Sequence, residues 1–481
     1  MQVRSLTVGP IIGAVTPSSV RLFGRGDRQP DRGWLSWWNT WRERWYPTSP
    51  RWCTGVARLR RRGDLSYGAP VYFPMKPHFD WTGIAVFANL EAVTEYEYQI
   101  GWFYATDRDR QRVILDWSQA ETYQFRTASR DRSQMRSFIF GSCRYLLKLF
   151  SGSIWDDRGD KTFRAIADQL DAGIETDALL MLGDQIYADD LNAFDPDTKL
   201  SQFFARYRDH FTQPHQRSLM ARVPTYMTLD DHEIEDNWPH KANDGDRVTL
   251  YPVALHSYLT YQASHSPLFD LTPEGTRITG TPTKLWYSFR DGCCDFFITD
   301  TRTERQVDHP DQLELLSPRQ MEAIKAWLED GAEAVKFIGS AVPFFPDGVD
   351  PSDDKWSGFI DQRDELLEWI RDRQIRRVVF LSGDVHCSLS ASLNCDHDRE
   401  FQIISLISSA FFWPYPDRKY TEFQMEGAIV SHAPTPYQVK VHTPIVREDN
   451  FTRVTASLLG ITVETFSRKG RPLTHTTLSF A

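Results

Sequence analysis

Two patterns of hydrophobic and polar positions divide the chain near residue 130. Before it, short segments alternate apolar and polar residues between turn signals, as in "EYEYQIGWFY" at 95–104. Such alternation is typical of strands with one buried face, and no long helical period interrupts it. We therefore predict a small antiparallel β-sandwich domain over residues 1–130. Its expected strands lie at 19–26, 55–61, 82–90, 95–104 and 121–127.

After residue 137, apolar runs alternate with segments of helical spacing. The run "ALLML" at 178–182 predicts a buried strand, and "PRQMEAIKAWLED" at 318–330 predicts an amphipathic helix. A hairpin with a D-G turn is expected over 285–300. These elements predict a second domain over 137–481, with the boundary near the polar segment 130–136. Its other expected strands are 137–140, 224–229, 335–340 and 377–383, and its other expected helices are 162–170, 201–211, 253–263 and 360–373.

The composition is that of an ordinary globular protein, since 41% of the 481 residues are hydrophobic and 25% are charged. A net charge of −10 argues against general binding to nucleic acid or to an acidic membrane. No segment approaches the roughly 18 apolar residues that a transmembrane helix needs, and the N-terminus shows no export signal. We therefore expect a cytoplasmic protein with reduced cysteines.

Polar side chains follow four of the apolar runs where each run ends. They belong to the sequences "GSC" (141–143), "GDQIY" (183–187), "DDHE" (230–233) and "SGDVH" (382–386). Each ending alone has an ordinary explanation, such as a buried thiol or a helix cap. Functional groups collect at the carboxyl ends of strands in open sheets. Four such endings in one chain therefore indicate a single functional site.

The chemistry of these endings favours metal ions over a nucleophilic triad. The stretch "TLDDHEIEDNW" (228–238) carries five acidic side chains, which repel one another unless they are solvated, paired or coordinated. A thiol, a phenol, carboxylates and imidazoles together fit an acidic iron beside a second, oxygen-preferring divalent ion. Asp184 is well placed to bridge the two ions.

The series GSC, GDxIY, DDHExxDN and SGDVH resembles the alkaline phosphatase D (PhoD-like) family of calcineurin-like metallophosphoesterases. The resemblance extends over nearly the whole chain, because residues 8–26 look like the opening of that family's β-sandwich. Further family-like blocks are "DTRTER" (300–305), "SPRQMEAIKAWL" (317–328), "DKWSGF" (354–359) and "ISSAFF" (407–412). The resemblance implies an α+β fold, in which a four-layer α/β/β/α metallophosphoesterase sandwich follows the small antiparallel β-sandwich.

The resemblance also implies a set of metal ligands. Cys143 and Tyr187 should bind ferric iron (Fe3+) through a thiolate and a phenolate, together with His386. Asp184 should bridge the iron and a divalent metal, for which Ca2+ is expected and Mn2+ or Zn2+ are alternatives. Four further residues are expected at the divalent metal or as residues that orient its ligands: Asp231, Asp384, Asp230 and Asn237.

The activity implied is hydrolysis of a small-molecule phosphate ester, either a monoester or a diester. A metal-bound hydroxide would attack phosphorus in line, and His232 would act as the general acid that protonates the leaving alkoxide. Arg144 and Arg302 are candidate phosphate contacts, although Arg302 could equally pair with Asp300 or another structural carboxylate. Arg144 follows the cysteine where related sequences often carry glutamine.

Two alternatives remain open from the sequence. The segment 34–52 holds six tryptophans and could bind a carbohydrate or a partner while the second domain is inert or only weakly binds metal; a loop that packs its rings against the domain is the simpler explanation. A cysteine hydrolase could instead use Cys143 as its nucleophile with a histidine base. Metal content separates these hypotheses, because only the phosphoesterase needs metal for turnover.

Overall fold

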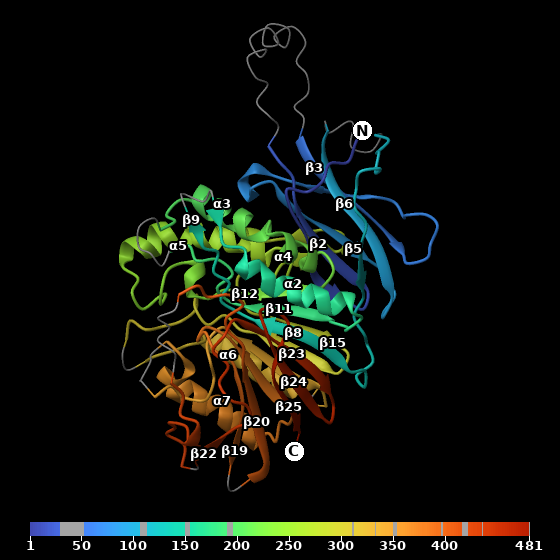
Figure 1. The fold of residues 1–481 in the computed structure, drawn as a ribbon. Coiled ribbons are helices and arrows are strands. Elements are labelled where there is room, and N and C mark those ends of the chain that lie inside the picture. Colours follow the sequence, from blue (N-terminus) through green and yellow to red (C-terminus); the bar gives the residue numbers. More distant parts are fainter. Residues whose placement is uncertain are drawn as a thin grey trace.

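The computed structural model describes most of the chain, which forms an α+β fold rich in β-sheet (Figure 1). The Trp-rich segment, apart from Trp52, lies outside the described residues, so the hypotheses that concern it stay predictions. The described residues are 1–28, 52–105, 113–149, 154–189, 196–309, 312–331, 333–349, 354–395, 398–415, 422–434 and 436–480.

Two antiparallel sheets form from the N-terminal strands, at the top of Figure 1. Alternation places residues such as Tyr98, Ile100 and Trp102 of β6 in a core with Leu22 and Phe125. One sheet has the order β1 (Val8–Thr16), β2 (Ser19–Arg25) and β5 (Thr82–Ala88), and the other has the order β4 (Val71–Pro74), β3 (Trp52–Arg61), β6 (Glu95–Ala105) and β7 (Tyr123–Arg126).

A six-stranded sheet carries the first three of the predicted strand endings. Strands β12 (Thr225–Thr228), β11 (Ala178–Leu182) and β8 (Arg136–Gly141) are parallel neighbours. Parallel neighbours need crossover connections, usually helical. Here α2 (Arg158–Asp171) joins β8 to β11, and α3 (Leu200–Phe211) and α4 (Pro214–Met220) join β11 to β12. Beyond β8 the sheet continues antiparallel through β23 (Asn450–Ser457), β24 (Gly460–Ser467) and β25 (Pro472–Ser479).

An eight-stranded sheet carries the fourth ending. The predicted hairpin is β15 (Tyr287–Asp291) and β16 (Cys294–Ile298). Beyond β16 the sheet continues with three strands parallel to it: β17 (Val335–Ser340), β18 (Val378–Ser382) and β20 (Asp398–Ile407). Helices α6 (Pro318–Glu329) and α7 (Ile360–Asp372) precede β17 and β18. The sheet ends in β19 (Leu389–Cys395), β22 (Tyr437–Val441) and β21 (Glu426–Ala428).

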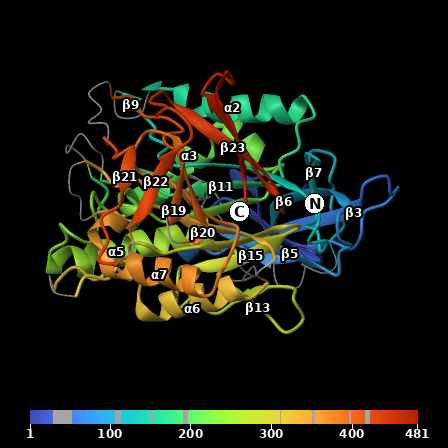
Figure 2. The same ribbon diagram turned by 90° about the horizontal axis from the view of Figure 1, so that it is seen from below.

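The two large sheets pack against each other through aromatic side chains. The ring of Phe138 in β8 lies 5.2 Å from Phe296 in β16 and 4.9 Å from Phe337 in β17, edge to face in both cases. Such pairs add stability beyond the area they bury. Figure 2 shows α2 on one side of the strands and α6 and α7 on the opposite side. The complete four-layer order expected from the sequence is a more detailed statement than these contacts support, and it stays a prediction.

Each strand and helix predicted from the sequence has a counterpart in the structure, but one helix begins much earlier than expected, and other elements, among them β1 and α4, were not predicted. The helix expected at 253–263 begins earlier, as α5 (Asp244–Tyr258), and ends in a π-helical turn, η3 (Leu259–Ala263). Asn243 caps its start by accepting hydrogen bonds from the backbone of Gly245 and Asp246, as N-cap residues do. The remaining described elements are two small sheets and three 3₁₀ turns. The sheets are β9–β10 (Lys148–Leu149, Ile154–Trp155) and β13–β14 (Asp270–Leu271, Ile278–Thr279), and the turns are η1 (Pro77–Phe79), η2 (Asp231–Glu233) and η4 (Trp356–Gly358).

The N-terminal strands are bonded to the rest of the chain. Arg217 of α4 donates to the carbonyl oxygens of Gly9 (2.6 Å) and Leu6 (2.9 Å). The hydroxyl of Tyr226 in β12 accepts from the backbone nitrogen of Val15 at 3.2 Å. These contacts hold the first sheet against the larger body. The domain boundary at 130–136 stays a prediction.

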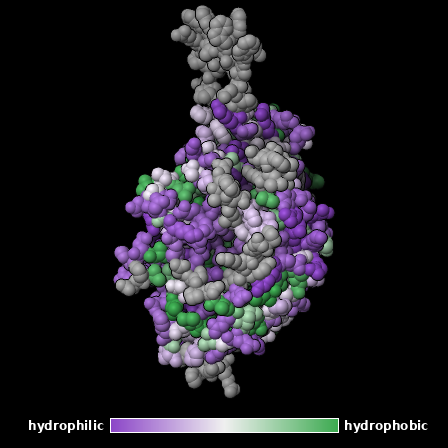
Figure 3. Space-filling view, turned by 60° about the vertical axis from the view of Figure 1, so that its left-hand side comes forward, coloured by the Kyte–Doolittle hydropathy of each residue, from purple (hydrophilic) through white to green (hydrophobic). Residues whose placement is uncertain are grey.

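The outer surface is mainly hydrophilic on the face drawn in Figure 3, where hydrophobic residues form small, separate groups. No helix in the described part of the chain combines the length and the apolar character required to cross a bilayer. Scattered apolar side chains of this kind are normal on a protein surface.

Candidate metal centre

The endings of β8 and β11 meet at Cys143 and Asp184. The thiol of Cys143 donates to Asp184 Oδ2 at 3.4 Å, and the hydroxyl of Tyr187 donates to the same oxygen at 3.3 Å. All three side chains are buried. The backbone carbonyls of Gly183 and Asp184 accept from the nitrogens of Cys143 and Arg144, so the two loops are held in register. The predicted thiol, carboxylate and phenol therefore lie in direct contact.

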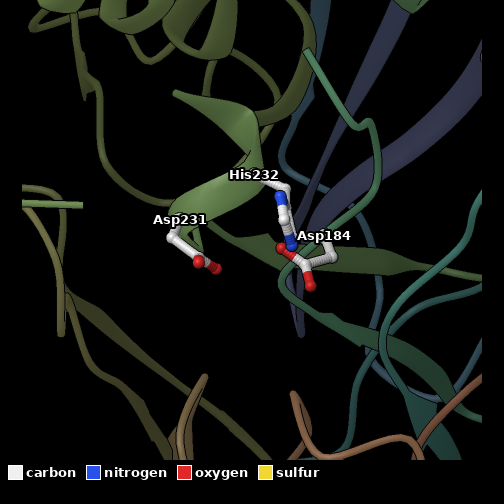
Figure 4. A group of neighbouring side chains, drawn as sticks. All are labelled: Asp184, Asp231 and His232. Atoms are coloured by element: carbon white, nitrogen blue, oxygen red, sulfur yellow. The ribbon is translucent and has the colours of Figure 1, made fainter. Parts of the chain in front are cut away.

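The ending of β12 brings two more carboxylates and an imidazole to this point. Asp184, Asp231 and His232 each offer a ligand atom within 4.8 Å of the others. Figure 4 shows the side chains of Asp231 and His232 reaching from one turn toward Asp184. A second, overlapping group adds Asp230 and Asp384 to Asp184 and Asp231 within the same limit. The loop after β18, in the other large sheet, thus contributes to the same site.

The backbone is strained at this site. Five of the predicted ligands have positive φ, between 53° and 67°, and they are among the eleven non-glycine residues with positive φ in the described chain. The left-handed region costs an L-residue about 1–2 kcal/mol, and such strain clusters at functional sites. The five are Cys143, Asp184, Asn237, Asp384 and His386.

The buried acids oppose one another electrostatically. Burial raises the pKa of Asp184 well above its usual range, and the charges of Asp230 and Asp231 add to this, although His232 opposes it. Burial also raises the pKa of Asp384 to about 6, with Asp354 and Asp231 adding to it. The pKa values of the Cys143 thiol and the Tyr187 phenol are raised by burial first and then by Asp184. Bound cations would reverse these shifts, since a coordinating thiol is deprotonated outright.

Two carboxylate oxygens in the cluster have no hydrogen-bond partner among the described residues: Asp184 Oδ1 and Asp230 Oδ2. Buried polar atoms are nearly always paired, because an unpaired one costs free energy. Coordination to a metal ion would satisfy both oxygens and offset the acidic charge. The residues present therefore fit metal ions.

His386 lies beside the Cys143 loop and is connected to it through Ser409. The hydroxyl of Ser409 donates to Cys143 Sγ at 3.1 Å, and its oxygen accepts from the backbone nitrogen of His386 at 3.1 Å. The ring of His386 stacks on Trp413 with a centroid distance of 4.0 Å. Trp413 also packs against Tyr187 at 5.7 Å, which places His386 at the Cys143–Tyr187 side of the site.

His232 is held by a carboxylate that sequence reasoning missed. Its Nδ1 lies 2.7 Å from Asp189 Oδ2, and its ring lies 4.4 Å from the Tyr187 ring. Burial alone would lower the pKa of His232, but the charges of Asp231 and Asp184 and the bond to Asp189 outweigh it and raise the pKa well above its usual value. Asp189 lies two residues after Tyr187, and this position in the "GDQIYADD" segment is the sequence signal that could have identified it as a site residue.

Glu233 is a second residue that sequence reasoning missed. Its carboxylate accepts from the backbone nitrogens of Asp184 (3.1 Å), Gln185 (2.6 Å) and Asp230 (2.9 Å) and from Nε2 of Gln262 (2.9 Å). It therefore ties the end of β11 to the end of β12 and positions Asp184 and Asp230. Burial raises the pKa of Glu233, although its hydrogen bonds to the two loops oppose this shift.

Asn237 and Asp230 have supporting contacts within the site. The backbone nitrogen of Asn237 donates to Asp231 Oδ2 at 2.6 Å, which orients that carboxylate. Asp230 Oδ1 accepts from Nε of Arg302 at 2.5 Å, so Asp230 keeps only Oδ2 for a metal ion.

The two arginines proposed as phosphate contacts are buried in the interior. Arg302 donates to Asp230, Asp231 and Asp354, in line with the alternative of a structural ion pair. The Nη1 of Arg144 lies 2.9 Å from His210 Nδ1, away from the acidic cluster, and burial lowers its pKa to about 10. Because both side chains are fully buried, the geometry favours structural roles, and phosphate contact stays a prediction.

Comparisons with known proteins identify the family of the chain. A family model described as PhoD-like phosphatase matches residues 147–439. Alkaline phosphatase D of Bacillus subtilis (strain 168) is 25% identical over 230 residues, which span 42% of this chain and only 37% of that relative.

Two solved structures share the fold over almost the whole chain. One, a structure of PhoD, has a TM-score of 0.68 at 16% identity, and the match covers 99% of this chain and 89% of that chain. The purple acid phosphatase PPD1 from yellow lupin (Lupinus luteus) seeds has a TM-score of 0.59 at 12% identity and covers 98% and 74%. At these identities the two structures show the fold alone. Since the family model spans more than half of the sequence, the chain belongs to the PhoD-like phosphatase family.

Proposed function

We propose that this protein hydrolyses phosphate esters, monoesters or diesters, with metal ions held at the ends of β8, β11, β12 and β18. The observation that carries the proposal is the group of four carboxylates within 4.8 Å of one another, two of which have buried, unpartnered oxygens. Membership of a family of phosphoester hydrolases supports it.

The ligand set divides by chemical type. Cys143, Tyr187 and His386 would hold ferric iron, because thiolate, phenolate and imidazole suit a redox-active ion. Carboxylate and amide oxygens suit a divalent ion such as Ca2+, with Mn2+ or Zn2+ as alternatives. When bound, the ions would polarise phosphoryl oxygens and lower the pKa of water. Asp184 would lie between the two ions, and Asp230, Asp231, Asn237 and Asp384 would supply the oxygen ligands.

His232 would supply the proton for the leaving alkoxide. Because its Nδ1 faces Asp189, its Nε2 is the nitrogen left to face the ester. The carboxylate of Asp189 fixes the ring orientation and stabilises the protonated imidazole. Glu233 would keep the Asp184 and Asp230 loops in place during turnover, without contact with the ester.

The fold proposed around this site is the four-layer α/β/β/α arrangement. Its support is the packing of Phe138 against Phe296 and Phe337 and the position of α2 opposite α6 and α7 (Figure 2). In this arrangement the ligands lie where the loops of both large sheets converge.

The cysteine hydrolase is less well supported. The hydrogen-bond partners of the Cys143 side chain include Ser142, Asp184, Ser409 and the backbone oxygen of Asp384, and none of these four is a histidine base. Burial and the charge of Asp184 raise the pKa of Cys143, which opposes formation of the thiolate nucleophile that such an enzyme needs.

Chelation tests the proposal directly. Purified protein should hydrolyse p-nitrophenyl phosphate or bis(p-nitrophenyl) phosphate, and exhaustive chelation should remove this activity, because the buried acids need cations to bind an anionic ester. Elemental analysis before and after chelation measures the metal content. Restored turnover on re-addition of metal is the control. Full activity in verified metal-free protein would contradict the proposal and favour Cys143 as a nucleophile.

Colour tests the assignment of Tyr187. Phenolate and thiolate donate electron density to an oxidising ion, so protein loaded with ferric iron should absorb visible light, whereas zinc with its filled d shell would not. Tyr187→Phe should shift or bleach the band, and dithionite should diminish it. Tyr145→Phe is the matched control, since Tyr145 packs against Tyr187 at 5.1 Å and its hydroxyl accepts a hydrogen bond from Tyr415. A colourless, fully active zinc protein without iron would disprove the role given to Tyr187.

A further inference from the structure

A group of aromatic side chains lies beside the proposed metal centre. It consists of Tyr145, Tyr187, Trp413 and Tyr415, and we refer to it as the aromatic wall. Trp413 packs edge to face against Tyr415 at 5.1 Å and is tilted on Tyr187 at 5.7 Å. The hydroxyls of Tyr145 and Tyr415 are 3.0 Å apart. The wall is continuous with the site, because the Tyr187 hydroxyl donates to Asp184.

The wall reaches the solvent on the side where the site is accessible. Cys143, Asp184 and Tyr187 are buried at the bottom of the site, whereas Asp384 and His386 are only half-buried. Trp413 and Tyr415 are also half-buried, and the Trp413 ring stacks on His386 with a centroid distance of 4.0 Å. Trp413 therefore lies beside the proposed metal centre with part of its side chain exposed.

We infer that Trp413, supported by Tyr415, binds a flat ring in the alcohol part of the ester, so that the preferred substrates are phosphate esters with an aromatic or heteroaromatic group. This inference rests on the proposed function. Packing of the protein interior does not require the rings of Trp413 and Tyr415 to stay partly exposed beside an acidic site. Aromatic side chains bind planar groups by stacking and tolerate many ring types.

A pair of esters separates the effect of ring binding from the effect of the leaving group on the chemical step. 2-Phenylethyl phosphate and n-propyl phosphate have leaving alcohols of similar acidity, so the cost of breaking the P–O bond is similar. The metal-loaded protein should have a kcat/KM about tenfold higher for the phenylethyl ester, the size expected of one stacked ring. Trp413→Leu should reduce this preference to about twofold or less, whereas Trp413→Phe should keep most of it. Tyr415→Leu should reduce it in part.

Trp369→Leu is the matched control, because Trp369 is half-buried on α7, which contributes no residue to the metal centre. It should leave the tenfold preference unchanged. Equal kcat/KM for the two esters in the unmodified protein would overturn the inference while leaving phosphoester hydrolysis intact. A Trp413→Leu protein that is slower on both esters by the same factor would also overturn it, since Trp413 would then only hold His386. Absence of turnover with any ester would overturn the proposed function, and ring binding with it.

Discussion

Asp184→Asn should lower kcat by about 10³-fold or more, equivalent to about 4 kcal/mol of transition-state stabilisation. Asp184 contacts Cys143 and Tyr187 through Oδ2, and its ligand atom lies within 4.8 Å of those of Asp230, Asp231 and Asp384. An amide has one carbonyl oxygen and no negative charge, so the variant should hold fewer metal ions. Steady-state kinetics and elemental analysis measure the two effects together.

Asp177→Asn is the matched control, because Asp177 immediately precedes β11 and Asp184 follows its other end. Asp177 accepts from the backbone nitrogen of Ser137 through Oδ2 and from Arg126 through Oδ1; an amide keeps one of these bonds, and Asp177 is not part of the carboxylate group. This variant should keep normal turnover and metal content. The metal-free Asp184→Asn protein should melt no lower than the metal-free parent, since one of four mutually repelling carboxylates has gone. A variant at Asp184 with full metal content and full activity would show that the ions bind elsewhere.

His232→Ala should slow turnover by roughly 10²–10⁴-fold, the usual contribution of a positioned general acid. The loss should be small for p-nitrophenyl phosphate and large for an alkyl phosphate, because a good leaving group needs less protonation. Asp189→Asn should show the same dependence on leaving group with a smaller loss, since Asp189 acts only through the Nδ1 of His232.

Metal content decides between two roles for His232. The imidazole lies close enough to Asp184 and Asp231 to act as a ligand, and in that case His232→Ala would lose metal. If His232 is the acid, the variant should keep its metals. Equal slowing on good and poor leaving groups would show that His232 does not protonate the alkoxide.

The sequence predicted the strands that build the site because their signal is local. Uniformly apolar runs such as "ALLML" are short enough to favour buried strands over helices, and β11 occupies the same residues, Ala178–Leu182. Parallel pairing of β8, β11 and β12 then brings their carboxyl ends to one edge. The proximity of Cys143, Asp184 and Asp231 follows from this topology.

The supporting residues could not be assigned in the same way. Glu233 looks like its acidic neighbours in the sequence, but its carboxylate faces the backbone of two loops, and only the tertiary fold decides that. Trp413 reaches His386 from the loop after β20. Strand β1 was missed because Gly9 and Pro10 interrupt its pattern, and α4 was missed because its seven residues are too few to show helical periodicity.

The positive φ angles at the metal centre have a consequence for protein engineering. Glycine adopts this backbone region at little cost, so a redesign guided only by conformational preference would place glycine at Cys143, Asp184, Asn237, Asp384 and His386. Each replacement would relax the backbone and delete a side chain that the proposed site needs. Attempts to increase the heat tolerance of this protein should therefore leave these five positions unchanged and seek gains on the outer helices α6 and α7.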